Sequence, residues 1–199
     1  MHIGYDYGPA DFDTRYRLVS TVSYELPFMR TNRWLGGWGT NAIISFQGGH
    51  PFTPFSSSRA YDLNKDGYTT DRLVSVVSPA DTITGNNPAD GYFDTTQWTR
   101  FVCPASENNG EWCNAPIGRN SIYGPRAVNV DFNLTKRFKI TERMGLTFQA
   151  NFFDLFNHPN MLPPSTGQND RSATYGSSTA TWGDNGGHRV TQLALRFDF

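Results

Sequence analysis

The final stretch of the chain, residues 189–199, constrains the possible folds more than any other. Apolar and polar side chains alternate along it, and one face collects Thr191, Leu193, Leu195, Phe197 and Phe199. A repeat of two residues is the pattern of a β-strand with one apolar side. The last strand of an outer-membrane barrel fits this pattern, because alternate residues face lipid. An ordinary sandwich strand is the alternative. In a barrel, Phe197 and Phe199 would act as an assembly signal.

The same alternation recurs in four earlier segments. Together with the final stretch, they predict strands over residues 15–26, 38–47, 127–138, 145–156 and 189–199. Two long connections, residues 48–126 and 157–187, are polar and irregular in sequence. A loop as long as the first argues against a compact soluble domain, whereas a membrane barrel carries its long loops on the extracellular side. The sequence therefore predicts an all-β fold, an antiparallel transmembrane β-barrel segment with long extracellular loops.

Composition excludes several other classes of protein. The 199 residues carry a net charge of -1, which gives no electrostatic reason to bind nucleic acid. No apolar run reaches the roughly 18 residues of a transmembrane helix, but a barrel strand needs only about 9–11 alternating residues. The four histidines are scattered, and no spacing joins Ser, His and Asp into a triad. We therefore expect no catalytic activity.

One stretch of the long region 48–126 has the donor spacing of a calcium loop. Oxygen-bearing side chains occur at alternate positions before a glycine, and the candidate ligands are Asp62, Asn64, Asp66, the carbonyl of Tyr68, and Asp71. An EF-hand has Glu at loop position 12, where this chain has Leu73. We expect a structural Ca²⁺ that holds an extracellular loop in place. The alternative is an Asx-rich turn without an ion.

The two cysteines, Cys103 and Cys113, lie in one polar loop. Their spacing matches no zinc pattern. A local disulfide in an oxidising compartment is the interpretation we favour, and two separate thiols are the alternative.

Five motifs resemble, in order along the chain, TonB-dependent outer-membrane receptors of the Oar-like type, which carry a carboxypeptidase-regulatory-like N-terminal domain. The motifs are residues 11–17 leading to 24–28, residues 46–52, residues 118–125 followed by 130–132, residues 151–160 and residues 195–199. The resemblance covers nearly the whole chain. It implies that the five strands are the C-terminal part of a barrel of about 22 strands in the bacterial outer membrane.

The resemblance also implies a function for the parent protein, namely import of a bulky nutrient such as a siderophore, cobalamin, a peptide or a glycan. Its partners would be outer-membrane lipid, the outer-membrane assembly machinery, the remaining barrel and plug, and the TonB system. The plug, the TonB-contacting segment and the earlier strands are missing from this sequence, so we expect a C-terminal fragment. Two alternatives stay open. One is a secreted, calcium-stabilised β-sandwich for binding or adhesion, and the other is a porin-like barrel made by several copies.

Overall fold

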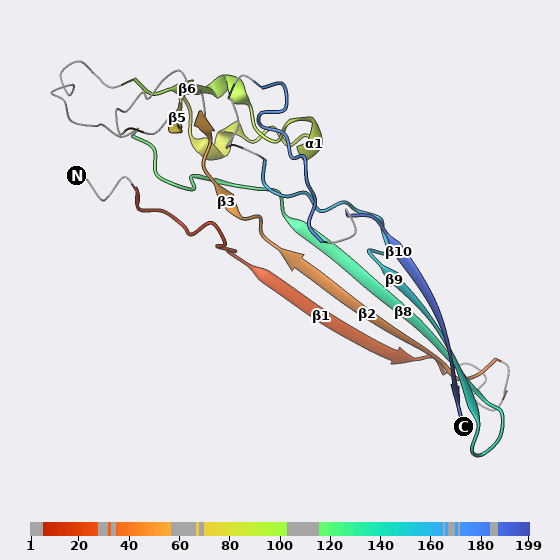
Figure 1. Ribbon diagram of the computed structural model, residues 1–199. Helices are drawn as coiled ribbons and strands as arrows, with labels where there is room; N and C mark the ends of the chain where they lie inside the picture. The colour runs from red at the N-terminus through yellow and green to blue at the C-terminus, as the bar shows by residue number, and fades with distance from the viewer. Residues whose placement is uncertain are drawn as a thin grey trace. The chain divides into compact units, whose positions relative to one another are not determined.

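The computed structural model describes residues 6–27, 32, 35–56, 67, 70–102, 116–164, 166, 170, 172–183 and 187–199. Its elements are strands and a few short helical turns (Figure 1). The chain divides into two compact units. The sheet unit comprises Arg17–Gln47, Ala127–Asn160 and Trp182–Phe199, and the loop unit comprises Met1–Tyr16, Gly48–Arg126 and Met161–Thr181. Within the described ranges, no helix has the length and apolar character to span a membrane.

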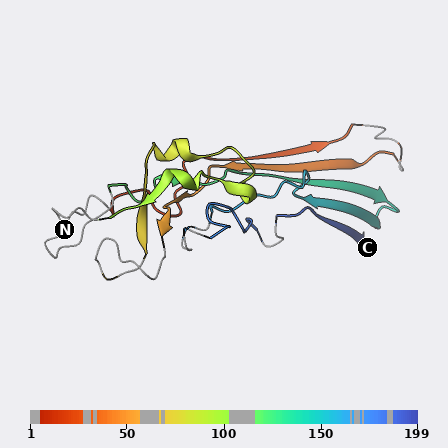
Figure 2. The ribbon, with the colours of Figure 1, turned by 90° about the horizontal axis from the view of Figure 1, so that it is seen from above.

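The sheet unit consists of five long antiparallel strands that lie side by side (Figures 1 and 2). They are β1 (Arg17–Glu25), β2 (Trp38–Gln47), β8 (Ala127–Lys139), β9 (Gly145–Phe153) and β10 (Val190–Asp198), and the order in the sheet is β1-β2-β8-β9-β10. Each strand lies where the alternation predicts one. The largest difference is that β9 ends at Phe153 and not at residue 156, because Asp154 and Asn157 adopt φ angles of 51° and 54°. Such left-handed residues turn the chain out of a strand.

The sheet is open. In the described part of the chain, β1 pairs only with β2, and β10 pairs only with β9. Every residue of β1 is exposed, as are all but one of β10. An unpaired edge leaves a row of backbone N–H and C=O groups without partners. The five strands therefore form a wall segment and not a closed barrel.

The loop unit contains short elements within residues 48–126, where the sequence predicts a long irregular loop. β3 (Pro51–Phe52) pairs with β7 (Ile122–Tyr123), and a second small sheet contains β4 (Phe55–Ser56), β5 (Asp71–Ser75) and β6 (Trp98–Arg100). Two 3₁₀ turns, η2 (Pro79–Thr82) and η3 (Thr95–Gln97), flank the short helix α1 (Pro88–Gly91). These elements are too short for their period to be recognised in the sequence.

An aromatic core holds the loop unit together. Its buried members are Phe52, Leu73, Phe93, Trp98, Ile122 and Tyr175. The ring of Phe93 is central, with its centroid 5.8 Å from those of Phe52 and Tyr175 and 6.1 Å from that of Trp98. Ring pairs at such separations add about 0.5–1.5 kcal/mol each to the burial of their surface. These residues come from segments more than a hundred positions apart, so no local pattern in the sequence reveals them.

Polar contacts attach the segment 161–181 to the small sheet of β4, β5 and β6. The guanidinium of Arg100 donates to both carboxylate oxygens of Asp170, at 3.0 and 2.7 Å, and the Ser56 hydroxyl donates to Asp170 at 3.1 Å. These donors, Arg100 first, lower the pKa of Asp170. The hydroxyl of Tyr175 donates to the Phe55 carbonyl at 2.8 Å. Part of the predicted loop 157–187 thus belongs to a folded core.

Candidate functional site

The sheet unit has one apolar and one polar face, because residues paired across antiparallel strands point to the same side. One row of partners runs through Tyr24, Thr40, Leu134, Ala150 and Leu193. The next row runs through Ser23, Asn41, Asn133, Asn151 and Gln192. The register therefore joins the alternating patterns of five separate strands into two continuous surfaces of opposite polarity.

The apolar face is open to its surroundings. Leu18 on β1 is 65% exposed, and Leu193 and Leu195 on β10 are 66% and 67% exposed. In a β-sandwich, a second sheet would cover such side chains. A contiguous exposed apolar surface of this kind marks contact with a membrane or a partner.

The polar face is lined by amide and hydroxyl side chains that bond to one another. Asn133 Nδ2 donates to Asn151 Oδ1 across the β8–β9 pair, and Thr135 Oγ1 donates to Asn133 Oδ1 at 2.8 Å. Asp131 Oδ1 accepts from Asn129 Nδ2 at 2.9 Å and from the backbone N–H of Asp154 at 3.0 Å. Side chains of this type suit a hydrated interior.

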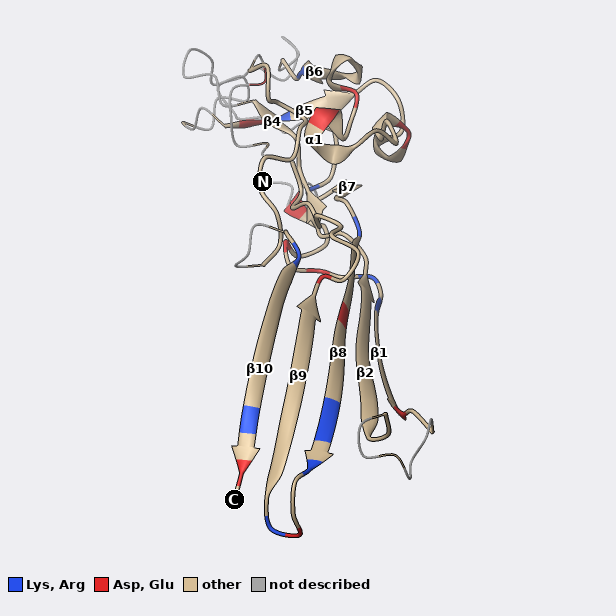
Figure 3. Ribbon diagram, turned by 90° about the vertical axis from the view of Figure 1, so that its right-hand side faces the viewer, with Lys and Arg blue, Asp and Glu red and all other residues tan. Residues whose placement is uncertain are grey.

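Charged residues are sparse on the long strands (Figure 3). β2 and β9 carry none, and on β8 and β10 the basic residues lie in the last third of the strand. A nearly uncharged wall is expected where a strand crosses lipid, since a Lys or Arg on the lipid face at mid-depth costs about 2–4 kcal/mol.

Lys136 is an exception that the alternation does not predict, because it stands in a row of the apolar face. Its cross-strand partners are Trp38 and Phe148, and its side chain is only 1% exposed. The ammonium nitrogen lies 5.4 Å from the ring centroid of Trp38 and 5.0 Å from that of Phe138. Both distances fall within the range of cation–π attraction. Aromatic rings thus cover this charge near the end of β8.

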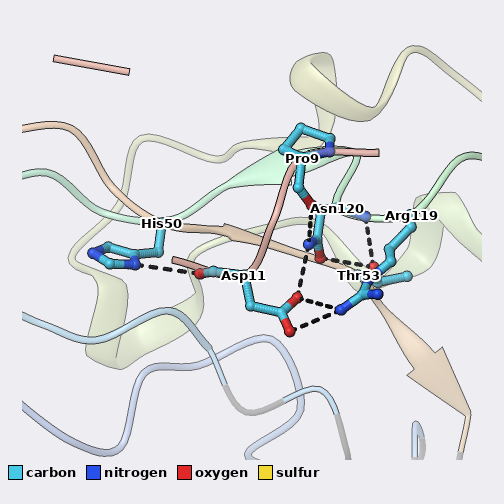
Figure 4. Close-up of polar contacts among 6 residues, drawn as sticks. All are labelled: Pro9, Asp11, His50, Thr53, Arg119 and Asn120. Atoms are coloured by element: carbon cyan, nitrogen blue, oxygen red, sulfur yellow. Dashed lines mark hydrogen bonds and ion pairs between the residues drawn. The ribbon is translucent and has the colours of Figure 1, made fainter. Parts of the chain in front are cut away.

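In the loop unit, six residues form a polar cluster, which we call the Asp11 cluster: Pro9, Asp11, His50, Thr53, Arg119 and Asn120 (Figure 4). The Asp11 carboxylate accepts from Asn120 Nδ2 at 2.8 Å and from Arg119 Nη2 at 3.0 and 2.8 Å. The backbone carbonyl of Asp11 lies 3.3 Å from His50 Nδ1. The hydrogen bond from Asn120, followed by that from Arg119, lowers the pKa of Asp11.

Asn120 is the centre of the Asp11 cluster. Its Nδ2 also donates to the Pro9 carbonyl at 2.7 Å, and its Oδ1 accepts from Thr53 Oγ1 at 3.1 Å. Its backbone N–H donates to the same hydroxyl at 2.7 Å. The residue is buried and has a φ of 55°. Asn tolerates this left-handed conformation better than most residues, because its short side chain can bond locally.

The cluster joins segments that lie beside three long strands in the sequence. Asp11 precedes β1, His50 follows β2, and Asn120 precedes β8. The backbones of two of these segments lie very close together, because a Cβ added to Gly49 would lie 1.9 Å from the carbonyl oxygen of Gly124. The Gly124 N–H donates to the His50 carbonyl at 2.9 Å. Only glycine permits so close a contact.

The comparison with protein families then decides the class of the protein. Residues 1–192 match the family model described as an outer membrane beta barrel domain. The chain belongs to this family. As an outer membrane beta barrel domain, it lies in the bacterial outer membrane, in agreement with the predicted location. Searches of curated proteins and of solved structures found no match.

Most of the predicted site residues of this barrel domain lie outside the described residues. Asp62, Asn64, Asp66 and Tyr68 of the predicted calcium loop do so, as do Cys103 and Cys113. Asp71 is described; it is buried at the start of β5 and pairs with Ser56 of β4. No group of three or more His, Cys, Asp or Glu in the described part could hold a metal ion.

The two terminal aromatic residues of the barrel domain are described. Phe197 lies in β10 and Phe199 follows it, and both side chains are exposed. Their rings stack with centroids 6.0 Å apart.

The sequence does not predict the Asp11 cluster as a site, although four of its six residues, Asp11, His50, Arg119 and Asn120, lie in motifs that carry the family resemblance. Residues 11–17, 46–52 and 118–125 carry separate motifs of this resemblance. Their order along the sequence contains no sign that they meet. The sequence feature that could point to the cluster is the grouping of polar residues with glycines and prolines directly beside the ends of predicted strands.

Proposed function

We propose that the chain is a wall segment of a TonB-dependent outer-membrane receptor that imports a bulky nutrient. The observation that carries the proposal is the open, two-faced sheet. In lipid, each unpaired backbone group costs several kcal/mol, so β1 and β10 both need neighbouring strands. The remaining barrel and plug of a parent protein would supply these strands and fill the polar interior.

Two further features favour a receptor over a passive pore. The loop unit has its own aromatic core and polar clusters, which provide a shaped surface on which a large ligand can be bound. The polar face offers amides such as Asn133 and Asn151 that can bond to a protein segment or a solute. The resemblance to TonB-dependent receptors points the same way.

Energy dependence of uptake tests this proposal. The host strain and a strain lacking the gene would be supplied with a mixture of a ferric siderophore, cobalamin, oligopeptides and oligosaccharides. Depletion of each compound would be followed by mass spectrometry, with and without a protonophore. We expect at least one compound to be taken up only when the gene is present and the inner membrane is energised. Gene-dependent uptake that persists with the protonophore would instead support the porin-like alternative, and equal depletion in both strains would refute import.

The partners of the chain follow from the same proposal. Lipid would contact the apolar face, and the assembly machinery would bind the end of β10 through Phe197 and Phe199. The variant Phe199→Ala should then reach the outer membrane in smaller amounts while the total amount synthesised is unchanged. Equal membrane levels of the variant and the wild type would refute this role.

A structural Ca²⁺ in the loop 62–71 remains part of the proposal, and its role would be to reduce the cost of ordering a long loop. Removal of Ca²⁺ with a chelator should make this region of the purified protein more sensitive to protease, and Ca²⁺ should restore resistance where Mg²⁺ does not. We further propose that the chain has no catalytic role. An enzymatic activity lost on one point mutation in the purified protein would contradict this.

A further inference from the structure

An open groove of about 750 Å³ lies within the loop unit, beside the Asp11 cluster. Residues drawn from 7–15 form one side, and residues drawn from 118–123 form the other. The two segments touch at their start, because a Cβ added to Gly8 would lie only 2.3 Å from the carbonyl oxygen of Arg119. The groove therefore has walls that are joined at Gly8 and bonded through the Asp11 cluster.

Arg15 presents a positioned cation to this groove. Its guanidinium carbon lies 3.8 Å from the ring centroid of Tyr123, and the Tyr123 hydroxyl donates to Asp13 Oδ2 at 3.2 Å. Tyr123 is thus held through its hydroxyl by this bond and through its backbone by the β3–β7 pair. Stacking of this kind fixes the plane of a guanidinium and leaves its N–H donors at the edge.

The two arginines of the groove differ in their partners. Arg119 is paired with Asp11, with a distance of 2.8 Å between Nη2 and Oδ2. Arg15 forms no ion pair among the described residues. A planar guanidinium with free donors is suited to bind a carboxylate or a phosphate through two parallel hydrogen bonds.

Other residues that line the groove supply a hydroxyl group and two aromatic rings. Ser121 lines the groove, and its hydroxyl is buried without a hydrogen-bond partner in the described part of the chain. A buried hydroxyl without a partner is costly. Two aromatic residues on the opposite side, Tyr7 and Phe12, are 85% and 81% exposed. Binding sites for small molecules combine exposed aromatic surface with a few convergent polar groups in this way.

We propose that this groove binds a ligand in which a phosphate or carboxylate group is attached to a ring. The oxyanion would accept hydrogen bonds from Arg15, the Ser121 hydroxyl would bond to the same end of the ligand, and the ring would contact Phe12 and Tyr7. A soluble solute and the phosphorylated sugar headgroup of an outer-membrane lipid share this chemistry. The inference does not depend on energy-coupled import, since it concerns binding alone.

Calorimetric titration of the full-length protein in detergent tests the site, with phenyl phosphate as the probe and phenol as the uncharged comparison. We expect phenyl phosphate to bind more tightly than phenol, and Arg15→Gln to weaken its binding at least about tenfold, or about 1.4 kcal/mol. The matched control is Arg126→Gln, which removes an exposed arginine of the same unit that does not line the groove. It should leave the affinity unchanged.

Two additional measurements separate a lost contact from a lost fold and distinguish the ligand sources. Arg15→Lys keeps the charge but removes the planar fork, so its affinity should fall between those of the wild type and Arg15→Gln. Phosphatidylcholine vesicles with lipopolysaccharide should displace phenyl phosphate if the source is a lipid headgroup, whereas a soluble ligand predicts no displacement. Equal affinity of the wild type and Arg15→Gln, or no binding of phenyl phosphate at about 1 mM, would overturn the proposal.

Discussion

Replacement of Asn120 separates two contributions to the stability of the loop unit. Asn120→Gly removes the side-chain hydrogen bonds to Pro9 and Thr53 but keeps a residue that adopts φ 55° without strain. Asn120→Ala removes the same bonds and adds a methyl group that disfavours this left-handed conformation. The difference in unfolding free energy between the two variants therefore measures what the left-handed backbone conformation costs a residue with a Cβ.

The expected magnitudes follow from these contacts. Two neutral hydrogen bonds contribute about 0.5–1.5 kcal/mol each, so Asn120→Gly should lower the free energy of local unfolding by about 1–3 kcal/mol. An alanine in the left-handed region costs about 1–2 kcal/mol, so Asn120→Ala should lose about 1 kcal/mol more than Asn120→Gly. The bond to the exposed Asp11 carboxylate is left out of this sum.

Native-state hydrogen exchange of the full-length protein measures these losses, with mass spectrometry of peptides that cover residues 116–125. The Gly124 N–H, which donates to His50, is one of the reporters. A loss of about 2 kcal/mol should speed local exchange about thirtyfold. The control Asn86→Gly changes an exposed asparagine of the same unit and should leave these peptides unaffected. Less than about a twofold change in both Asn120 variants would refute the central role of this residue.

Three further changes probe other parts of the molecule. Gly49→Ala would place a Cβ 1.9 Å from a facing carbonyl oxygen, so it should greatly reduce the folded protein recovered in the outer membrane, whereas Gly39→Ala, with open space around its Cβ, should not. Leu193→Lys on the apolar face should destabilise the protein folded in lipid vesicles by about 2–4 kcal/mol, and Gln192→Lys on the polar face by far less, as measured by denaturant titration. Burial raises the pKa of Tyr92 from 10.0 to about 12, so the neutral phenol stabilises the folded state below pH 10.0, and this contribution is lost as the pH rises through about 12. Tyr92→Phe should therefore lose less unfolding free energy than the wild type as the pH rises through about 12. An equal loss in both proteins would contradict the role of the buried Tyr92 phenol.

The long strands and the small elements of the loop unit differ in how far their sequences predict them. Alternation in segments such as 127–138 identifies each strand and its apolar face, because the period of two is a property of the extended backbone. The turn residue Asp154, with a φ of 51°, ends β9 before the predicted boundary, and an alternating pattern does not indicate such a turn. In the loop unit, β3 and β7 have two residues each, which is too short for any period.

The sequence by itself determined where the five long strands lie and which side of each is apolar, because polarity that alternates over nine or more positions is a local property of an extended chain. Only the tertiary structure decided which residues meet. The register aligned Asn41, Asn133 and Asn151 into one row, and the fold brought Asp11 to Asn120 across 109 positions. The physical reason is that strand patterning is local, whereas register, close glycine contacts and side-chain hydrogen bonds depend on distances that only the folded chain sets.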